Sequence, residues 1–218
     1  MIARAPRLDL EGLLRGEGRH AVGQGDPPVA ALALTVLLGG GLYGAVMGCF
    51  GLDAEQALYS AIKLPLLVFL SSLLCLPNFW VVNLLLGLGP DFAAACRGLM
   101  SAQATLAVAL AALAPVTGFF YASTDSYEFA KLLNFAVFGM ATFAAQRTLA
   151  RHYRPLLARR RRHAVALVAW PTLYFFVAGQ MAYVLRPFIG NPRLDTTFFR
   201  DPWWGNVYVD LWWAVRGL

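Results

Sequence analysis

The sequence predicts an all-α fold, a polytopic transmembrane helical bundle of about five spans. Of 218 residues, 59% are hydrophobic and only 14% are charged, whereas roughly 25% charged is usual in soluble domains. Asp, Glu, Lys and Arg are absent from residues 27–52, 64–90, 98–124, 132–146 and 163–185. Because roughly 20 helical residues cross a bilayer, four of these stretches are long enough to span it. The stretch 132–146 becomes long enough when Glu128 and Lys131 lie at its outer rim.

The N-terminal segment, residues 1–28, is predicted to be cytoplasmic and to be retained. It mixes four arginines with four acidic residues and has no apolar core of the signal-peptide type. Within it, leucines at partly helical spacing predict a short helix on the membrane surface over residues 8–15.

The five-span bundle is predicted within residues 29–186. Apolar residues run through it without the alternation of barrel strands, so the spans are expected to be helices. Span one covers about 29–50, where Gly39-Gly40-Gly41 allows close helix approach or a kink. Span two covers about 57–76, and Pro77-Asn78 then breaks or bends it before the apolar residues 79–88. Those residues either end one long kinked helix or form a short re-entrant piece.

The last three spans are predicted over about 98–122, 127–146 and 164–185. Asp125 or Ser126 is suited to cap the fourth span. A basic loop from Arg147 to His163 is expected to separate the fourth span from the fifth.

Loop charges predict the orientation of the chain. Arginines concentrate in the N-terminal segment, at Arg97 and in the loop after Arg147, whereas the two intervening loops carry acidic residues. Because Lys and Arg favour the cytoplasmic side of short loops, the N-terminus is predicted to be cytoplasmic and the C-terminus outside. The expected location is a bacterial inner membrane.

The tail, residues 187–218, is predicted to be an aromatic segment on the outer face. Four of the six tryptophans lie in the last 16 residues: Trp203, Trp204, Trp212 and Trp213. A helix from Trp203 would place several of these aromatic residues on one face. Such a helix would be an interfacial anchor or a contact surface for a partner subunit, and the sequence leaves both interpretations open.

The densest charge is a run of four arginines, Arg159, Arg160, Arg161 and Arg162. Beside the end of a span, each basic residue is attracted to anionic lipid by about 1 kcal/mol. The run is therefore expected to contact anionic lipid on the cytoplasmic face, or else to bind a protein partner. Nucleic acid is not expected to be a partner, because no aromatic platform interleaves with the run.

Two lysines lie one to two turns inside the predicted outer ends of spans two and four. Lys63 and Lys131 can snorkel to the interface, and Lys131 can also pair with Glu128 three residues before it. The alternative is a shared polar cavity in the outer half of the bundle, formed by Lys63, Asn78, Lys131 and Asn134.

The sequence predicts no catalytic residue, cofactor or metal site. It contains no zinc-protease, nucleophile-elbow or phosphate-loop motif. His20, His152 and His163 lack metal-ligand spacing, and the three cysteines are odd in number without a CxxC pair. No span holds Asp or Glu away from its ends, which disfavours a pump driven by carboxylate protonation.

Four short motifs carry a resemblance to known proteins: Ala61-Ile62-Lys63-Leu64-Pro65, Leu76-Pro77-Asn78, Ser126-Tyr127-Glu128-Phe129 and Leu185-Arg186-Pro187-Phe188-Ile189-Gly190. With them, the chain resembles uncharacterised bacterial multi-pass proteins that are loosely similar to the Yip1 superfamily. The resemblance implies five spans, a cytoplasmic N-terminus and a non-enzymatic protein that works through partners. It transfers no catalytic residue.

The sequence therefore predicts a scaffold or accessory subunit of a larger inner-membrane complex. Its expected partners are membrane lipids and other protein subunits or further copies of itself. The alternative is a small transporter or channel with a polar cavity near Lys63 and Lys131, and an enzyme acting on lipids is the weakest of the three hypotheses.

Overall fold

The computed structural model describes residues 29–191, 194–201 and 205–216. The predicted surface helix over residues 8–15 lies outside these ranges, as do Trp203 and Trp204. The described helices are α2 (Val29–Gly48), α3 (Ala54–Leu85), η2 (Gly89–Asp91), α4 (Phe92–Ser123), α5 (Tyr127–Arg159), α6 (His163–Val184) and α7 (Val207–Arg216).

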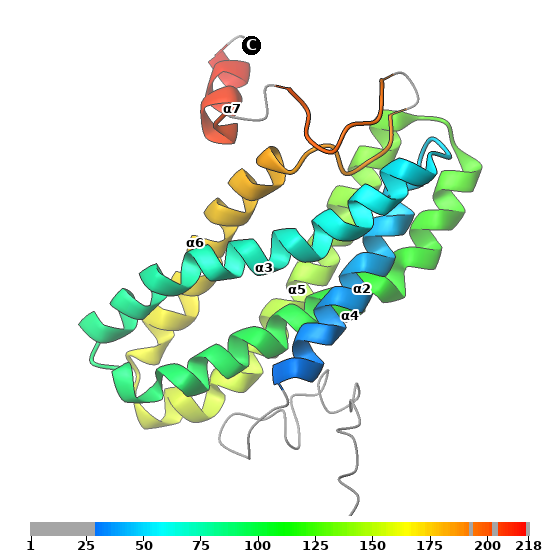
Figure 1. Cartoon of the computed structure of the whole chain (residues 1–218). Helices are drawn as coiled ribbons and strands as arrows, with labels where there is room; N and C mark the ends of the chain where they lie inside the picture. The colour runs from blue at the N-terminus through cyan, green and yellow to red at the C-terminus, as the bar shows by residue number, and fades with distance from the viewer. Residues whose placement is uncertain (1–28, 192–193, 202–204, 217–218) are drawn as a thin grey trace, which may run out of the picture.

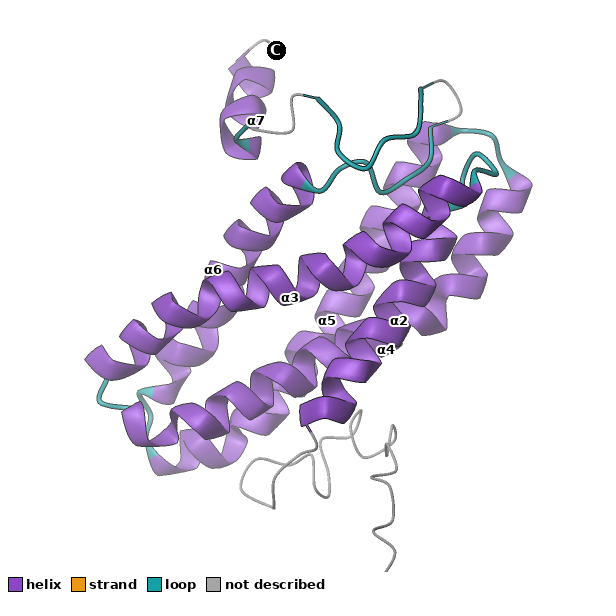
Figure 2. Cartoon of the chain, viewed as in Figure 1, coloured by secondary structure: helices purple, strands orange, loops and turns teal. Residues whose placement is uncertain are grey.

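The five helices α2 to α6 are long and apolar enough to cross a membrane, and no strand occurs among the described residues. Figure 2 shows this all-helical architecture. The predicted fold class, a bundle of five transmembrane helices, is confirmed.

The second span is one continuous helix. α3 runs for 32 residues through Pro65 and Pro77, so residues 79–88 are not a separate re-entrant piece. The helix ends where Gly87 adopts a φ of +69° and the Leu88 amide donates to the Asn83 carbonyl at 2.8 Å. A left-handed glycine followed by this hydrogen bond is a common helix ending, because it satisfies carbonyls that would otherwise lack a donor.

The predicted basic loop from Arg147 to His163 is wrong. α5 continues as a helix to Arg159, and only residues 160–162 separate it from α6. A helix of 33 residues is about 50 Å long, well beyond the roughly 30 Å hydrocarbon core. The end of the charge-free stretch at residue 146 is therefore not the end of the helix.

α2 lies between α3 and α4 and packs closely on both (Figure 1). α4 packs on α5, and α6 packs mainly on α3. The close approach of α2 and α3 depends on Gly44 and Gly48. A Cβ atom built on Gly44 would lie 2.2 Å from the Ser60 carbonyl oxygen, and one on Gly48 would lie 2.5 Å from that of Gln56.

The chain after α6 crosses back over the ends of α2 and α3 (Figure 1). We call residues 185–191 and 194–201 the tail cap. The end of the bundle that the tail cap covers is called the tail end. The opposite end, which holds residues 159–162, is called the arginine end. Ser60 Oγ donates to the Phe188 carbonyl at 2.5 Å, and a Cβ on Gly190 would lie 2.9 Å from the Gly48 carbonyl oxygen. The tail cap is thus packed against the ends of α2 and α3 at Phe188 and Gly190.

Candidate functional site

Lys63 is the most unusual polar residue of the bundle. Its side chain is fully buried beneath the tail cap, and its Nζ donates to the Pro187 carbonyl at 2.8 Å. The Nζ also lies 4.7 Å from the ring centroid of Phe198 and 5.8 Å from that of Tyr59. Lys63 therefore does not snorkel to the surface, as a lysine near the end of a span is expected to do.

Burial and the nearby positive charge of Arg200 both disfavour the Lys63 cation, and its described contacts include no carboxylate. No ion pair of Lys63 occurs among residues 29–191, 194–201 and 205–216. A carbonyl dipole and two aromatic faces carry negative potential toward the ammonium group. Gln56 Nε2 donates to the same Pro187 carbonyl at 3.1 Å, so this oxygen joins two side chains of α3 to the tail cap.

A second contact of the tail cap lies at the start of α3. Thr196 donates a hydrogen bond to Asp53, the residue that caps α3 and accepts from the Glu55 amide at 2.9 Å. These hydrogen bonds, chiefly that of Thr196, lower the pKa of the Asp53 carboxyl below its usual 3.8. The carboxylate is therefore ionised at neutral pH and holds the cap at the helix N-terminus.

The four residues of the predicted polar cavity are not brought together. Asn78 is exposed and lies 15 residues along α3 from Lys63, which is about 22 Å in a helix. Lys131 is half exposed and pairs with Glu128 at 2.7 Å, as the spacing of three predicts.

Asn134 is buried, but it belongs to a different cluster. Its Oδ1 accepts from the Tyr43 hydroxyl at 2.8 Å, and its Nδ2 donates to the Tyr121 hydroxyl at 2.5 Å and to the Ala130 carbonyl at 2.7 Å. The cluster joins α2, α4 and α5. The sequence predicted Asn134 as a cavity residue. The two tyrosines were not predicted as its partners, although a tyrosine hydroxyl at membrane depth needs a partner.

At the arginine end, the predicted contact arginines all lie on the surface. Arg160 Nη1 donates to the Gly87 carbonyl at 2.7 Å, and Arg162 Nη1 donates to the Leu86 carbonyl at 3.3 Å. These guanidinium groups satisfy carbonyls at the C-terminus of α3, where the helix dipole favours positive charge. Contact of Arg159, Arg160, Arg161 and Arg162 with anionic lipid stays a prediction.

A buried histidine lies beneath this arginine turn. His163 has no exposed surface, and its Nε2 lies 3.2 Å from Asp91 Oδ2. Asp91 Oδ1 lies 3.7 Å from Arg159 Nη1. The cluster links α5, α6 and η2 and fixes the turn between the last two spans. Among the described residues, no three His, Cys, Asp or Glu side chains gather closely enough to hold a metal ion.

The C-terminal helix α7 docks on the tail end of α6. Gln180 Nε2 donates to the Gly205 carbonyl at 2.6 Å, and the Val207 amide donates to Gln180 Oε1 at 3.1 Å. The Tyr208 hydroxyl donates to the Phe176 carbonyl at 2.5 Å, and partial burial raises its pKa. Trp212 is exposed with Arg216 above its ring, whereas the side chain of Trp213 lies outside the described part of the chain.

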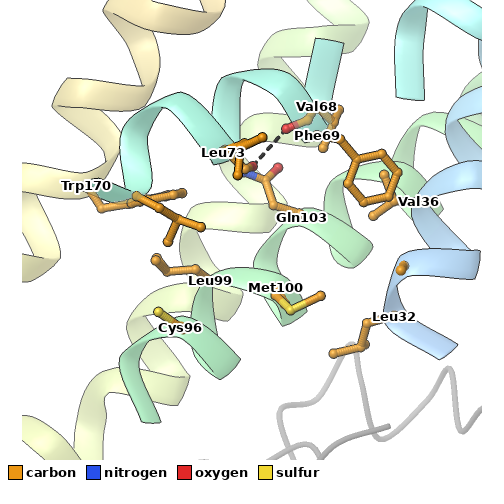
Figure 3. Close-up of a pocket in the computed structure, with 13 residues that line it drawn as sticks. Leu32, Val36, Val68, Phe69, Leu73, Cys96, Leu99, Met100, Gln103 and Trp170 are labelled. Carbon is orange, nitrogen blue, oxygen red and sulfur yellow. Dashed lines mark hydrogen bonds between the residues drawn. The ribbon is translucent and has the colours of Figure 1, made fainter. Parts of the chain in front are cut away.

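A cavity of about 330 Å³ lies between α2, α3 and α4 (Figure 3). Its wall is almost entirely apolar, and Trp170 of α6 contributes to it. The other lining residues are Leu32, Ala33, Val36, Val68, Phe69, Ser72, Leu73, Leu76, Cys96, Leu99, Met100 and Gln103. None of Lys63, Asn78, Lys131 and Asn134 lines it.

No protein-family model matches the sequence, and neither a curated protein nor a solved structure matches it. The likeness to the Yip1 superfamily therefore stays a prediction. The contacts within the chain are the basis for the function proposed below.

Proposed function

We propose that this integral membrane protein is non-enzymatic and acts as a scaffold or accessory subunit of a larger membrane complex. The observation that carries the proposal is the sparse packing of α6. Only His163, Ala166 and Trp170 of its 22 residues are buried, and all three lie in its first eight residues. We call residues 171–184 together with α7 the α6–α7 arm.

The α6–α7 arm packs on the bundle through Leu173, Tyr174 and Val177, and it presents an aromatic surface elsewhere. Gln180 and Tyr208 join its two helices through the hydrogen bonds given above. Phe175 is 70% exposed and Trp212 is 54% exposed. Aromatic residues supply much of the binding energy at protein interfaces, and helices in lipid associate mainly through van der Waals packing and hydrogen bonds. A partner helix packed along residues 171–184 would cover a face that the bundle leaves open.

Site-specific photo-crosslinking in the native membrane tests this function. A photoreactive phenylalanine analogue at Phe175 should crosslink to a protein subunit, because this position faces away from the bundle. The matched control is Phe143 on α5, which is 63% exposed and should crosslink only to lipid.

Purification in mild detergent completes the test. The particle mass should exceed that of one chain plus its detergent. A strict monomer, together with equal lipid-only crosslinking at Phe175 and Phe143, would contradict the scaffold proposal.

Transport through a polar cavity is the second candidate, and the burial of Lys63 is the observation that favours it. Ionisable residues inside a membrane protein commonly mark a pathway. The separation of Lys63 from Asn78, Lys131 and Asn134 weighs against a shared cavity. Solute flux into proteoliposomes should be the same for the unmodified protein, Lys63→Met and Lys131→Met; a loss of flux in Lys63→Met alone would favour transport.

A further inference from the structure

The cavity between α2, α3 and α4 lies at the depth of one leaflet. Its α4 residues run from Cys96 to Gln103, so they begin beside Arg97, where the charge-free stretch of α4 starts, and extend about 9 Å into that stretch. Half of a hydrocarbon core is about 15 Å thick. Leu32, near the start of α2, also lines the cavity, so the cavity occupies the level of acyl chains in the leaflet at the arginine end.

The cavity opens sideways into this leaflet. Leu73 of α3 lines it and is 62% exposed, so the described part of the chain does not close the cavity over this residue. α3 and α4 make few contacts with each other, and α5 contributes no lining residue. A chain-shaped ligand can therefore enter from the membrane at the side of the cavity that Leu73 lines.

The wall selects an apolar ligand. Two of the lining residues carry a hydroxyl or amide side chain, Ser72 and Gln103. The Ser72 hydroxyl donates to the Val68 carbonyl at 2.8 Å. Both Gln103 and Ser72 lie within hydrogen-bonding reach of the Tyr174 hydroxyl oxygen of α6. A ligand in this cavity would meet mainly carbon and sulfur atoms (Figure 3).

The volume favours an acyl chain over a partner helix. Two turns of an α-helix about 10 Å across and 11 Å long occupy roughly 900 Å³, whereas the cavity holds about 330 Å³. A slender hydrocarbon chain fits that space, and small-molecule pockets begin near this size.

Charge at the same end indicates the lipid class. Arg159, Arg160, Arg161 and Arg162 are exposed at the arginine end, and arginine binds phosphate oxygens through a fork of donors. We propose that the cavity holds one acyl chain of an anionic phospholipid from the leaflet at the arginine end. This proposal does not depend on the scaffold function, since a monomer could bind lipid equally well.

Tryptophan quenching by lipids with brominated acyl chains tests the proposal. Two single-tryptophan proteins retain either Trp170 or Trp80, with every other tryptophan replaced by phenylalanine. The two lie at similar depths, about 10 Å and 8 Å from the arginine ends of their helices. Trp80 is 39% exposed and should sense bulk lipid, whereas Trp170 is 3% exposed. In phosphatidylcholine vesicles with increasing brominated phosphatidylglycerol, we expect Trp170 to be quenched as strongly as Trp80 and at a lower fraction of brominated lipid.

Filling the cavity supplies the specific control. Ala33 lines the cavity, so Ala33→Phe should remove most quenching of Trp170 and leave Trp80 unchanged. Ala136→Phe, at an exposed alanine of α5, should change neither. Helical circular dichroism and gel-filtration volume verify folding, and Ala33→Leu replaces Ala33→Phe if the larger side chain prevents folding.

Each other outcome contradicts the proposal in a defined way. Weak quenching of Trp170 that Ala33→Phe leaves unchanged would mean that no acyl chain enters. The same weak quenching in a protein that purifies as a dimer would assign the cavity to a second copy. If Trp170 were half quenched at the same mole fraction of brominated phosphatidylglycerol as of brominated phosphatidylcholine, the selectivity for an anionic lipid would be overturned.

Discussion

Lys63 illustrates what a single residue in this sequence could and could not indicate. The sequence places a lysine near the end of an apolar span, where an ionisable group is costly. Its partner, the Pro187 carbonyl, lies 124 residues away in a segment without regular periodicity. No local pattern connects the two residues, so the burial of Lys63 could not be predicted. The pairing of Lys131 with Glu128 was predictable because both residues lie on one helix turn.

Substitutions of Lys63 separate the role of its charge from the role of its volume. Lys63→Met keeps an unbranched apolar stem, and the Pro187 carbonyl retains Gln56 as a donor. We therefore expect a change in unfolding free energy within about 1 kcal/mol. Lys63→Glu would place a carboxylate against the same carbonyl oxygen and should cost at least about 3 kcal/mol. Equilibrium unfolding in mixed micelles measures both values, with Lys131→Met as the exposed control. Equal losses for Met and Glu would mean that the ammonium group itself is required.

Asn134 should act together with Tyr43. Asn134→Ala removes the acceptor of the Tyr43 hydroxyl and the donor to the Tyr121 hydroxyl. Hydrogen bonds between membrane helices contribute about 0.6 kcal/mol on average and at most about 1.7, so we expect a loss of about 1 to 2 kcal/mol. In a double-mutant cycle with Tyr43→Phe, the two losses should add to more than the loss in the double variant. Strict additivity would show that the 2.8 Å contact contributes no coupling.

At the scale of elements, the packing of α2 follows from its glycines. The run Gly39-Gly40-Gly41 indicated close approach, but the spacing Gly40, Gly44 and Gly48 was the stronger signal, because small residues four apart line one helix face. The prediction of close approach rested on the run of three glycines and not on this spacing. In the structure, Gly44 and Gly48 meet the backbone of α3, while a Cβ built on Gly39 would lie 2.8 Å from the Ala107 carbonyl oxygen of α4.

Gly44→Ala should destabilise the contact between α2 and α3. Its methyl group would lie 2.2 Å from the Ser60 carbonyl oxygen, and a backbone atom cannot rotate away. We expect the free energy of unfolding to fall by about 1 to 3 kcal/mol, which is usual for overpacking. Gly139→Ala is the matched control on α5, because no atom lies within 4 Å of its added methyl group. That control should be neutral or stabilising by up to about 1 kcal/mol through helix propensity. Equal unfolding free energies for the two variants would contradict close packing at Gly44.

At the scale of the whole molecule, the five spans were predictable because each one is a local property of composition. Charge-free stretches located every spanning helix, although α3, α4 and α5 extend further than those stretches. The tail cap and the α6–α7 arm could not be predicted, because they depend on contacts between distant segments such as Ser60 with Phe188. The cavity was missed for the same reason, since its apolar lining residues look like ordinary core residues in the sequence.

The orientation of the molecule is the remaining prediction at this scale, and its cysteines allow a direct test. Cys49 is exposed beside the end of α2 at the tail end, Cys75 is buried and Cys96 lines the cavity. If the arginine end is cytoplasmic, as loop charge predicts, a membrane-impermeant maleimide should label Cys49 in intact spheroplasts. In a Cys49→Ser background, Arg161→Cys should be labelled only after the membrane is permeabilised, because Arg161 is exposed at the opposite end. The reverse pattern would place the arginine end outside, and the acyl-chain cavity would then belong to the outer leaflet.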